Sequence, residues 1–259
     1  MSNRLVVFTG AGLSADSGLR TFRDSNGLWE EHDVNQIANI HRWKQNFDLV
    51  HRFYNERRLQ AAAAEPNAAH RMVADWQRRY PTTVITQNVD GLLEKAGCTD
   101  VLHVHGSLNE MKCEACGHVW EVAAETQWVA GTDKCPLCPS KKGVKPGVIF
   151  FGEAAPGYGP MCKAFEAMEA GDVLMVIGTS GQVVDIGTVA QTTKAYSILS
   201  NLEPAPPIQF KTYSAYIPTL DDTFDLTLHG RASEMAARLD LIIQGLLGPS
   251  SAQEGNAHG

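Results

Sequence analysis

The sequence predicts an α/β fold with a doubly wound parallel sheet, interrupted by a helical insertion and by a small cysteine-rich module. Three features of the chain predict it. Short apolar runs alternate with segments of helical pattern. The first apolar run leads directly into a glycine turn, and two Cys-x-x-Cys pairs occupy a stretch that lacks the alternation.

The alternation of strands and helices starts close to the first residue. Apolar runs that we interpret as strands cover residues 4–9, 83–86, 101–104, 147–151 and 173–178. Helical patterns cover residues 46–64, 67–79 and 161–169. Because parallel strands joined by helices end at the same edge of a sheet, we expect a ligand site at the carboxyl ends of these strands.

We expect one domain over residues 1–247, followed by a polar, disordered tail at 248–259. The main part of this domain comprises residues 1–19, 66–107 and 147–247. Residues 20–65 form the helical insertion, and residues 108–146 form the cysteine-rich module.

Composition restricts the class of protein. With 259 residues, of which 44% are hydrophobic, the chain can bury a sizeable core. No apolar run approaches the ~20 residues needed to cross a bilayer, and the early strand leaves no room for a signal peptide, so we expect a cytoplasmic protein without membrane insertion. A net charge of −7 disfavours direct nucleic-acid binding but is compatible with a basic protein substrate. The oligomeric state stays open, and a monomer is compatible with the sequence.

The glycine turn after the first strand fits a dinucleotide-binding fingerprint of the Rossmann-like type, with Gly10, Ala11, Gly12 and Ala15 as its small residues. Glycine would let the backbone approach a pyrophosphate, and the following helix would offer free N–H groups. A dehydrogenase would also need a second strand that ends in an acidic residue ~20 residues later. The polar segment that follows does not provide one, so an oxidoreductase remains only an alternative.

Four of the six cysteines occur as two Cys-x-x-Cys pairs. Their spacing is typical of a four-thiolate tetrahedral zinc site, and four protein ligands leave no coordination position open for catalysis. We therefore predict one structural zinc ion on Cys113, Cys116, Cys135 and Cys138. The two remaining cysteines, Cys98 and Cys162, are interpreted as small buried hydrophobic residues.

Six segments in order resemble the motifs of the sirtuins, which are NAD-dependent protein deacylases, and more specifically their bacterial-type class III. The segments are GAGLSADSGLRTFRDSNGLW (10–29), TQNVDGLLEKAG (86–97), HVHGSL (103–108), PGVIFFGE (146–153), GTSGQV (178–183) and NLEP (201–204). The chain departs from the family pattern in two places. After GTSGQV, the sequence VDIG stands where the family usually has a proline, and the segment of residues 204–222 is longer than the corresponding family segment.

The resemblance implies that NAD is the cofactor and that acyl-lysine side chains of proteins are the substrates. The implied NAD contacts are Gly10, Ala11, Gly12, Ser14, Phe22, Arg23, Trp29, Gln87, Asn88, Val89, Asp90, Gly178, Thr179, Ser180, Asn201, Leu202, Glu203 and Ala232. The implied substrate contacts include Val148, Phe151, Gly152 and Glu153. Asn88 and Asp90 could instead simply form the turn after their strand.

His105 is the expected catalytic base, acting together with Asn88. It follows a predicted strand, and an imidazole with a pKa near ~6.5 can accept a proton at neutral pH. In the family mechanism the acyl oxygen attacks the ribose carbon as nicotinamide leaves, and the histidine deprotonates a ribose hydroxyl. The products would be free lysine, nicotinamide and O-acyl-ADP-ribose. We interpret His103 as a packing residue.

Tyr54 and Arg57 are three residues apart on a predicted helix and therefore share one face. A phenol beside a guanidinium could hold the carboxylate of a succinyl or malonyl group, as a Tyr-x-x-Arg pair does in the resembled class. The alternative is an ordinary exposed pair, with Arg52 and Arg58 as equally ordinary neighbours. Protein ADP-ribosyl transfer and a non-catalytic NAD-binding or zinc module remain alternative functions.

Overall fold

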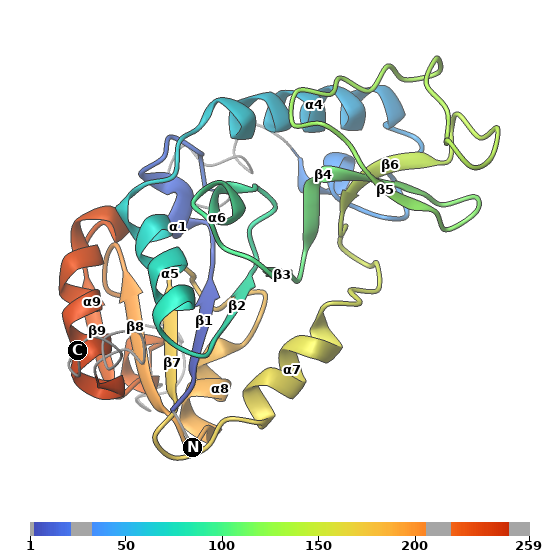
Figure 1. Cartoon of the computed structure of the whole chain (residues 1–259). Helices are drawn as coiled ribbons and strands as arrows, with labels where there is room; N and C mark the ends of the chain where they lie inside the picture. The colour runs from blue at the N-terminus through green and yellow to red at the C-terminus, as the bar shows by residue number, and fades with distance from the viewer. Residues whose placement is uncertain (1–2, 22–32, 206–218, 249–259) are drawn as a thin grey trace, which may run out of the picture.

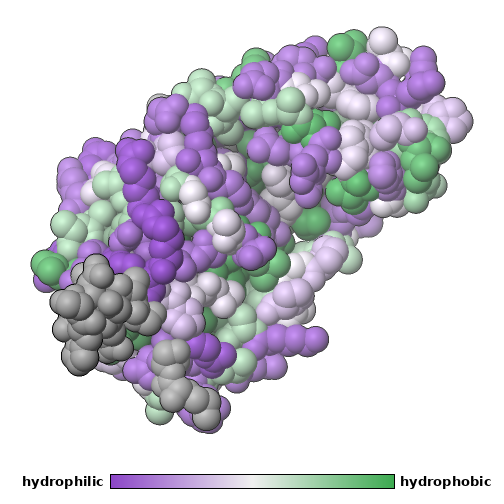
Figure 2. All heavy atoms as spheres, viewed as in Figure 1, coloured by the Kyte–Doolittle hydropathy of each residue, from purple (hydrophilic) through white to green (hydrophobic). Residues whose placement is uncertain are grey.

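The computed structural model describes residues 3–21, 33–205 and 219–248 (Figure 1). Phe22, Arg23 and Trp29, which the resemblance assigns to NAD binding, lie outside the described residues, as does most of the predicted tail. Within the described part of the chain, no helix is both long and apolar enough to cross a membrane. On the face shown in Figure 2, hydrophobic residues are scattered among hydrophilic ones.

The main sheet has six parallel strands in the order β3-β2-β1-β7-β8-β9 (Figure 1). Their bounds are Leu5–Thr9 for β1, Thr82–Thr86 for β2, Leu102–His103 for β3, Val173–Ile177 for β7, Tyr196–Asn201 for β8 and Leu226–His229 for β9. The strand order changes direction between β1 and β7, and such a switch point opens a crevice at the carboxyl ends of the strands. The predicted doubly wound sheet is confirmed, with β8 and β9 as two additional strands.

Both faces of the main sheet are covered because the strand residues alternate between them. Leu5 and Val7 contribute to one core with helices α5 (Ala68–Arg79) and α9 (Ala232–Leu247). Val6 and Phe8 contribute to the opposite core, which includes residues of α7 (Tyr158–Glu166) and α8 (Ile186–Thr192). Strands that are buried on both faces explain why their sequences are almost continuously apolar.

A second, three-stranded antiparallel sheet consists of β5 (Val119–Glu121), β4 (Gly106–Cys113) and β6 (Val144–Val148). A strand at residues 147–151 was predicted for the main sheet, and this prediction is wrong. The strand begins earlier and pairs with β4. A Cβ on Gly147 would lie 2.4 Å from the Glu110 Cβ, and one on Gly106 would lie 2.0 Å from the Gly147 carbonyl oxygen. Glycine at both positions therefore permits this pairing.

The helical insertion packs on this second sheet, and the two together form what we call the small lobe (Figure 1). It contains α3 (Val34–Ile37) and α4 (Phe47–Ala63), which confirms the helix predicted at 46–64. Arg58 of α4 is 1% exposed, and it donates hydrogen bonds to the carbonyl oxygens of Leu108 (2.6 Å) and Thr126 (2.9 Å). Arg58 is thus no ordinary surface neighbour, because it joins α4 to the second sheet.

Two smaller expectations also differ from the structure. The helix after the glycine turn was expected to offer free N–H groups; this helix, α1 (Gly12–Ala15), has only four residues and therefore only a small helix dipole. Cys98 is buried as expected, whereas Cys162 on α7 is exposed. The remaining short elements of the described ranges are α6 (Leu92–Lys95) and a 3-10 turn, η1 (Asp221–Thr223).

Candidate functional site

The turn after β1 lies directly against the turn after β7. The Gly12 backbone N–H donates to the Gly178 carbonyl oxygen at 2.9 Å. A Cβ on Gly10 would lie 2.6 Å from that same oxygen, and a Cβ on Gly12 would lie 2.7 Å from the Gly178 Cα. These glycines were expected to let a pyrophosphate approach the backbone. In the structure their first role is to let the two turns meet at the switch point.

Side chains tie the carboxyl ends of β2, β7 and β8 together. The Gln87 amide donates to the Thr179 hydroxyl at 2.9 Å. The Asn201 side chain accepts from the Thr179 N–H at 3.1 Å and donates to the Thr179 carbonyl oxygen at 3.0 Å. The predicted residues Gln87, Thr179 and Asn201 therefore share one edge of the sheet. Ser180, Leu202 and Glu203 are exposed next to them. Ala232, the first residue of α9, is instead buried in the hydrophobic core.

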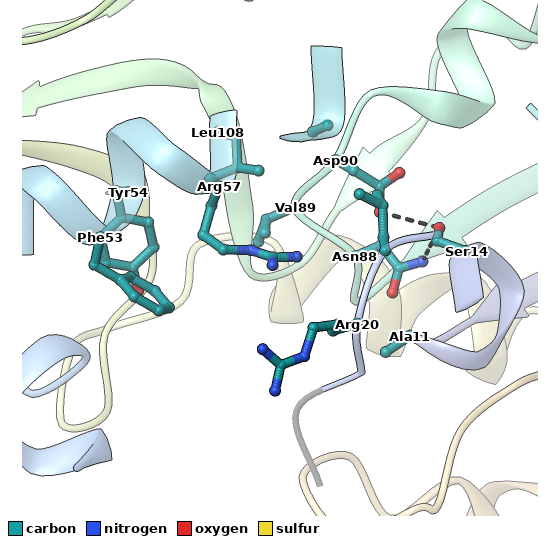
Figure 3. Close-up of a pocket in the computed structure, with 12 residues that line it drawn as sticks. Ala11, Ser14, Arg20, Phe53, Tyr54, Arg57, Asn88, Val89, Asp90 and Leu108 are labelled. Atoms are coloured by element: carbon teal, nitrogen blue, oxygen red, sulfur yellow. Dashed lines mark hydrogen bonds between the residues drawn. The ribbon is translucent and has the colours of Figure 1, made fainter. Parts of the chain in front are cut away.

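A small cavity of about 40 Å³ lies between this edge and the small lobe (Figure 3). Its lining comes from the first turn, from α4, from the segment after β2 and from β4. The lining residues are Ala11, Ser14, Leu19, Arg20, Phe53, Tyr54, Arg57, Ala61, Asn88, Val89, Asp90 and Leu108. Seven of them were predicted site residues, namely Ala11, Ser14, Tyr54, Arg57, Asn88, Val89 and Asp90.

Ser14 is the centre of a buried hydrogen-bond network. The donors of this network determine which atoms carry the protons. The Asn67 N–H donates to His70 Nδ1 at 3.2 Å, so the His70 proton is on Nε2, which faces the Ser14 hydroxyl at 3.3 Å. Asn88 Nδ2 also donates to this hydroxyl at 3.1 Å, and the hydroxyl donates to Asp90 at 3.0 Å. Burial lowers the pKa of His70 to about 4, which keeps this ring neutral.

Asp90 accepts hydrogen bonds on both carboxyl oxygens, one from Ser14 and one from the Leu92 N–H at 3.1 Å. Burial raises the pKa of Asp90, and these two hydrogen bonds oppose that shift. Figure 3 shows the amide nitrogen of Asn88 directed toward Ser14 and its oxygen on the other side. An amide and a carboxylate are thus held rigidly beside the cavity, where they could bind a carboxamide or a hydroxyl group.

His105 lies in the turn between β3 and β4, at the carboxyl edge of the main sheet. Its Nδ1 is 3.2 Å from the Gln87 carbonyl oxygen, which can only accept, so Nδ1 carries the proton of the neutral ring. Nε2 is 3.0 Å from the Tyr158 hydroxyl. Burial lowers the pKa of His105, and the Gln87 carbonyl opposes this effect. The ring is therefore neutral at pH 7, with its basic nitrogen facing Tyr158, a residue that the sequence analysis did not single out.

His103 was expected to serve packing, and this interpretation is wrong. Its Nδ1 is 2.8 Å from the Asn88 carbonyl oxygen, and its Nε2 is 2.8 Å from a carboxyl oxygen of Glu94. His105 likewise contacts a backbone carbonyl of Gln87, so both histidines reach back to the segment that follows β2.

Tyr54 and Arg57 both line the cavity from α4, and Figure 3 shows the Arg57 guanidinium directed toward the segment of Asn88 and Val89. Tyr54 stacks on Phe150 at 5.6 Å between ring centroids, and burial raises its pKa. Burial and the nearby Arg20 lower the pKa of Arg57, which donates to the Gln60 side chain at 2.6 Å. The cavity therefore holds a guanidinium and a phenol on one wall.

The predicted substrate segment differs in exposure along its length. Val148 is buried, whereas Phe151 is 47% exposed and forms an isolated bridge with Asn39. Gly152 has a φ of +83°, which favours glycine. The side chain of Glu153 is only 6% exposed and pairs with Lys112 at 2.6 Å and Lys145 at 3.1 Å. The Glu153 carboxylate is therefore engaged inside the protein.

The four predicted zinc ligands meet in the small lobe, with all four sulfur atoms within 4.8 Å of one another. Cys113 and Cys138 are 3.7 Å apart at Sγ, as are Cys116 and Cys135. A tetrahedral zinc ion with Zn–S bonds of ~2.3 Å places its sulfur ligands about 3.8 Å apart. The geometry of the cluster thus fits one zinc ion.

Known proteins resemble this chain in sequence. The sequence profile of the Sir2 family matches residues 10–185. An "NAD-dependent protein deacylase" from Helicobacter hepaticus is 40% identical over 240 residues, which cover 83% of this chain and 92% of that protein. A protein of the same name from Escherichia coli K12 is 39% identical over 209 residues, covering 78% and 73%.

Solved structures resemble this chain as well. A Sir2 homologue in complex with NAD superposes with a TM-score of 0.79 at 31% identity, covering 95% of this chain and 91% of that one. An ADP-ribose complex of a mutant Sir2 homologue has a TM-score of 0.81 at 31% identity, with 95% and 94% covered. On this evidence, the chain belongs to the Sir2 family.

Proposed function

We propose that this protein is an NAD-dependent protein-lysine deacylase that removes acetyl groups and acidic acyl groups such as succinyl and malonyl. The observation that carries the proposal is the neutral His105 ring beside the segment of Asn88 and Asp90, at the carboxyl edge of the main sheet. The names of the relatives support the same activity.

The residues of the site have chemistry that suits this reaction. Asn88 and Asp90, held by Ser14, would orient the nicotinamide and its ribose, while Gly10, Gly12 and Thr179 would border the phosphates and the second ribose. NAD, when bound, supplies the ribose carbon that receives the acyl oxygen. His105 Nε2 would accept a proton from a ribose hydroxyl after moving away from Tyr158.

The small lobe supplies the substrate side of the proposal. The exposed segment at Phe151 would bind the substrate backbone, while Arg57 and Tyr54 would hold the carboxylate of an acidic acyl chain. Zinc would be structural, since four thiolates leave it no open position. A cytoplasmic location, where thiols remain reduced, belongs to the same proposal.

Two alternatives predict different products. Protein ADP-ribosyl transfer would move labelled ADP-ribose to protein, whereas a non-catalytic NAD-binding module would release no nicotinamide. An oxidoreductase is disfavoured, because the next described strand of the main sheet after β1 begins only at Thr82, far from the expected ~20-residue spacing.

The decisive experiment measures turnover of matched acetyl-lysine and succinyl-lysine peptides by mass spectrometry, with and without NAD. We expect NAD-dependent loss of the acyl group by the wild type and its disappearance in His105→Tyr. If folded, zinc-loaded protein turns over neither peptide but transfers labelled ADP-ribose, the deacylase proposal is refuted and protein ADP-ribosyl transfer takes its place.

A further inference from the structure

His103, the last residue of β3, lies between two hydrogen-bond acceptors. Its Nδ1 faces the carbonyl oxygen of Asn88 and its Nε2 faces the carboxylate of Glu94, each at 2.8 Å. The His103 side chain is 16% exposed and that of Glu94 is 43% exposed, so water competes little for the contact with Asn88 but can reach the contact with Glu94. The ring thus connects the segment that borders the cavity with helix α6.

The nature of these two partners determines the protonation of the ring. A backbone carbonyl carries no proton, and a carboxylate only accepts, so both ring nitrogens must donate. His103 is then an imidazolium. His70, on the other side of the same segment, provides the contrast, because its Nδ1 accepts from the Asn67 N–H and the ring is neutral.

The charges around His103 favour this protonated form. Glu94 faces it from α6, Asp90 faces it from the segment after β2, and Glu110 faces it from β4. Burial acts to lower the pKa of His103, but the hydrogen bond and charge of Glu94 outweigh burial, and the net shift is upward. Since the folded-state pKa exceeds the unfolded one, this stabilisation is present at low pH and is lost as pH rises through the folded pKa.

Three hydrogen bonds hold Asn88 in place, and His103 makes one of them. The Asn88 N–H donates to the Thr86 hydroxyl at 3.0 Å, its side-chain amide donates to Ser14, and its carbonyl accepts from His103. Asn88 is 6% exposed, so loss of the third contact would leave a buried carbonyl without its partner.

We propose that His103 is a positioning residue of the cavity: as an imidazolium it clamps the Asn88 backbone to Glu94, and the clamp opens when the proton leaves. When His103 is neutral, one nitrogen lone pair faces either the carbonyl or the carboxylate, and one of the two contacts becomes repulsive. The proposal rests on NAD being the ligand that Asn88 orients. NAD binding should therefore weaken in alkaline solution, where the neutral His105 is unaffected.

Two variants separate the clamp from a general loss of structure. Glu94→Gln offers an amide N–H to the unprotonated Nε2, so a neutral His103 can still donate to Asn88 and the clamp no longer needs a charge. His103→Asn places an amide near the position of Nδ1 and removes the titrating ring. Both variants should bind NAD with little dependence on pH.

The test combines nuclear magnetic resonance of the free protein with calorimetric NAD titrations between pH 7 and ~9.5. We expect the ¹⁵N shifts of His103 to report an imidazolium at pH 7, and the Asn88 amide signals to move as it deprotonates. The Kd for NAD should rise about tenfold in the wild type, the size expected for one lost hydrogen bond, and less than about twofold in both variants.

Three results would overturn the clamp: a singly protonated His103 at pH 7, Asn88 signals that ignore its titration, or the same alkaline loss of NAD affinity in Glu94→Gln. Absence of NAD binding at every pH would instead refute the proposed function. The Asn88 signals of the free protein would still decide whether His103 holds this segment.

Discussion

Replacing Arg57 by methionine tests how the cavity selects its acyl group. Methionine keeps much of the length of the side chain and removes the guanidinium. Arg57 lines the cavity beside Tyr54, and its own contact is a hydrogen bond to the exposed Gln60, so the change removes little of the core. An acidic acyl chain would lose its ionic partner, whereas an acetyl group has no carboxylate to lose.

The magnitude follows from the strength of a hydrogen bond to a charged group. Such a bond contributes about 1.5–3 kcal/mol, and each ~1.4 kcal/mol changes a rate by tenfold. Arg57 is only partly buried, and burial together with Arg20 lowers its pKa, but a guanidinium stays charged at neutral pH. We expect kcat/KM for succinyl-lysine to fall by roughly 10- to 150-fold, and kcat/KM for acetyl-lysine to change by less than about threefold.

The assay compares succinyl-lysine and acetyl-lysine versions of one peptide at saturating NAD. Arg52→Met is the matched control, because Arg52 is an exposed residue of the same helix and does not line the cavity. An equal loss on both peptides, or the same change in Arg52→Met, would refute the assignment of Arg57 to the acyl carboxylate.

The other predictions concern the base, a buried arginine and the metal cluster. Because burial lowers the pKa of His105, kcat/KM should rise with pH through a midpoint below 6.5 and should not change further around neutral pH. A midpoint above 6.5 in this pH profile would contradict a buried base. Arg58→Met should lower the free energy of unfolding by roughly 2–4 kcal/mol in urea titrations, since the carbonyls of Leu108 and Thr126 lose their donor; a loss below about 1 kcal/mol would show that water replaces it. A strong chelator should remove one zinc per chain and expose the small lobe to protease before the main sheet, as limited proteolysis would show; uniform cleavage of both would argue against a local structural role.

Several features of this protein followed from local pattern alone. The spacing of two Cys-x-x-Cys pairs was enough to predict a cluster that the fold brings within 4.8 Å. The apolar runs predicted the central strands, because strands covered on both faces carry a nearly continuous apolar signal. The position of His105 after such a run was enough to predict that it lies at the carboxyl edge of the sheet.

Local pattern failed where a residue's role depends on a distant partner. Residues 147–151 were expected in the main sheet, because nothing in a short apolar run says which strand it pairs with; in the structure β6 pairs with β4. The positions of Arg58 and Arg52 in the sequence do not show that Arg58 is buried and Arg52 is exposed. The carbonyl partner of Arg58 at Leu108 is 50 residues away in the chain.

The sequence by itself determined the chemistry of the site: its cysteines, its glycine turns and a histidine after a strand. Only the tertiary structure decided the state of each titratable group. His70 is neutral because a backbone N–H occupies one nitrogen, His105 is neutral because burial disfavours its charge, and His103 donates twice because Glu94 faces it. The three imidazoles are identical as residues, and protonation follows from burial and from the polarity of neighbours that folding brings within hydrogen-bond distance.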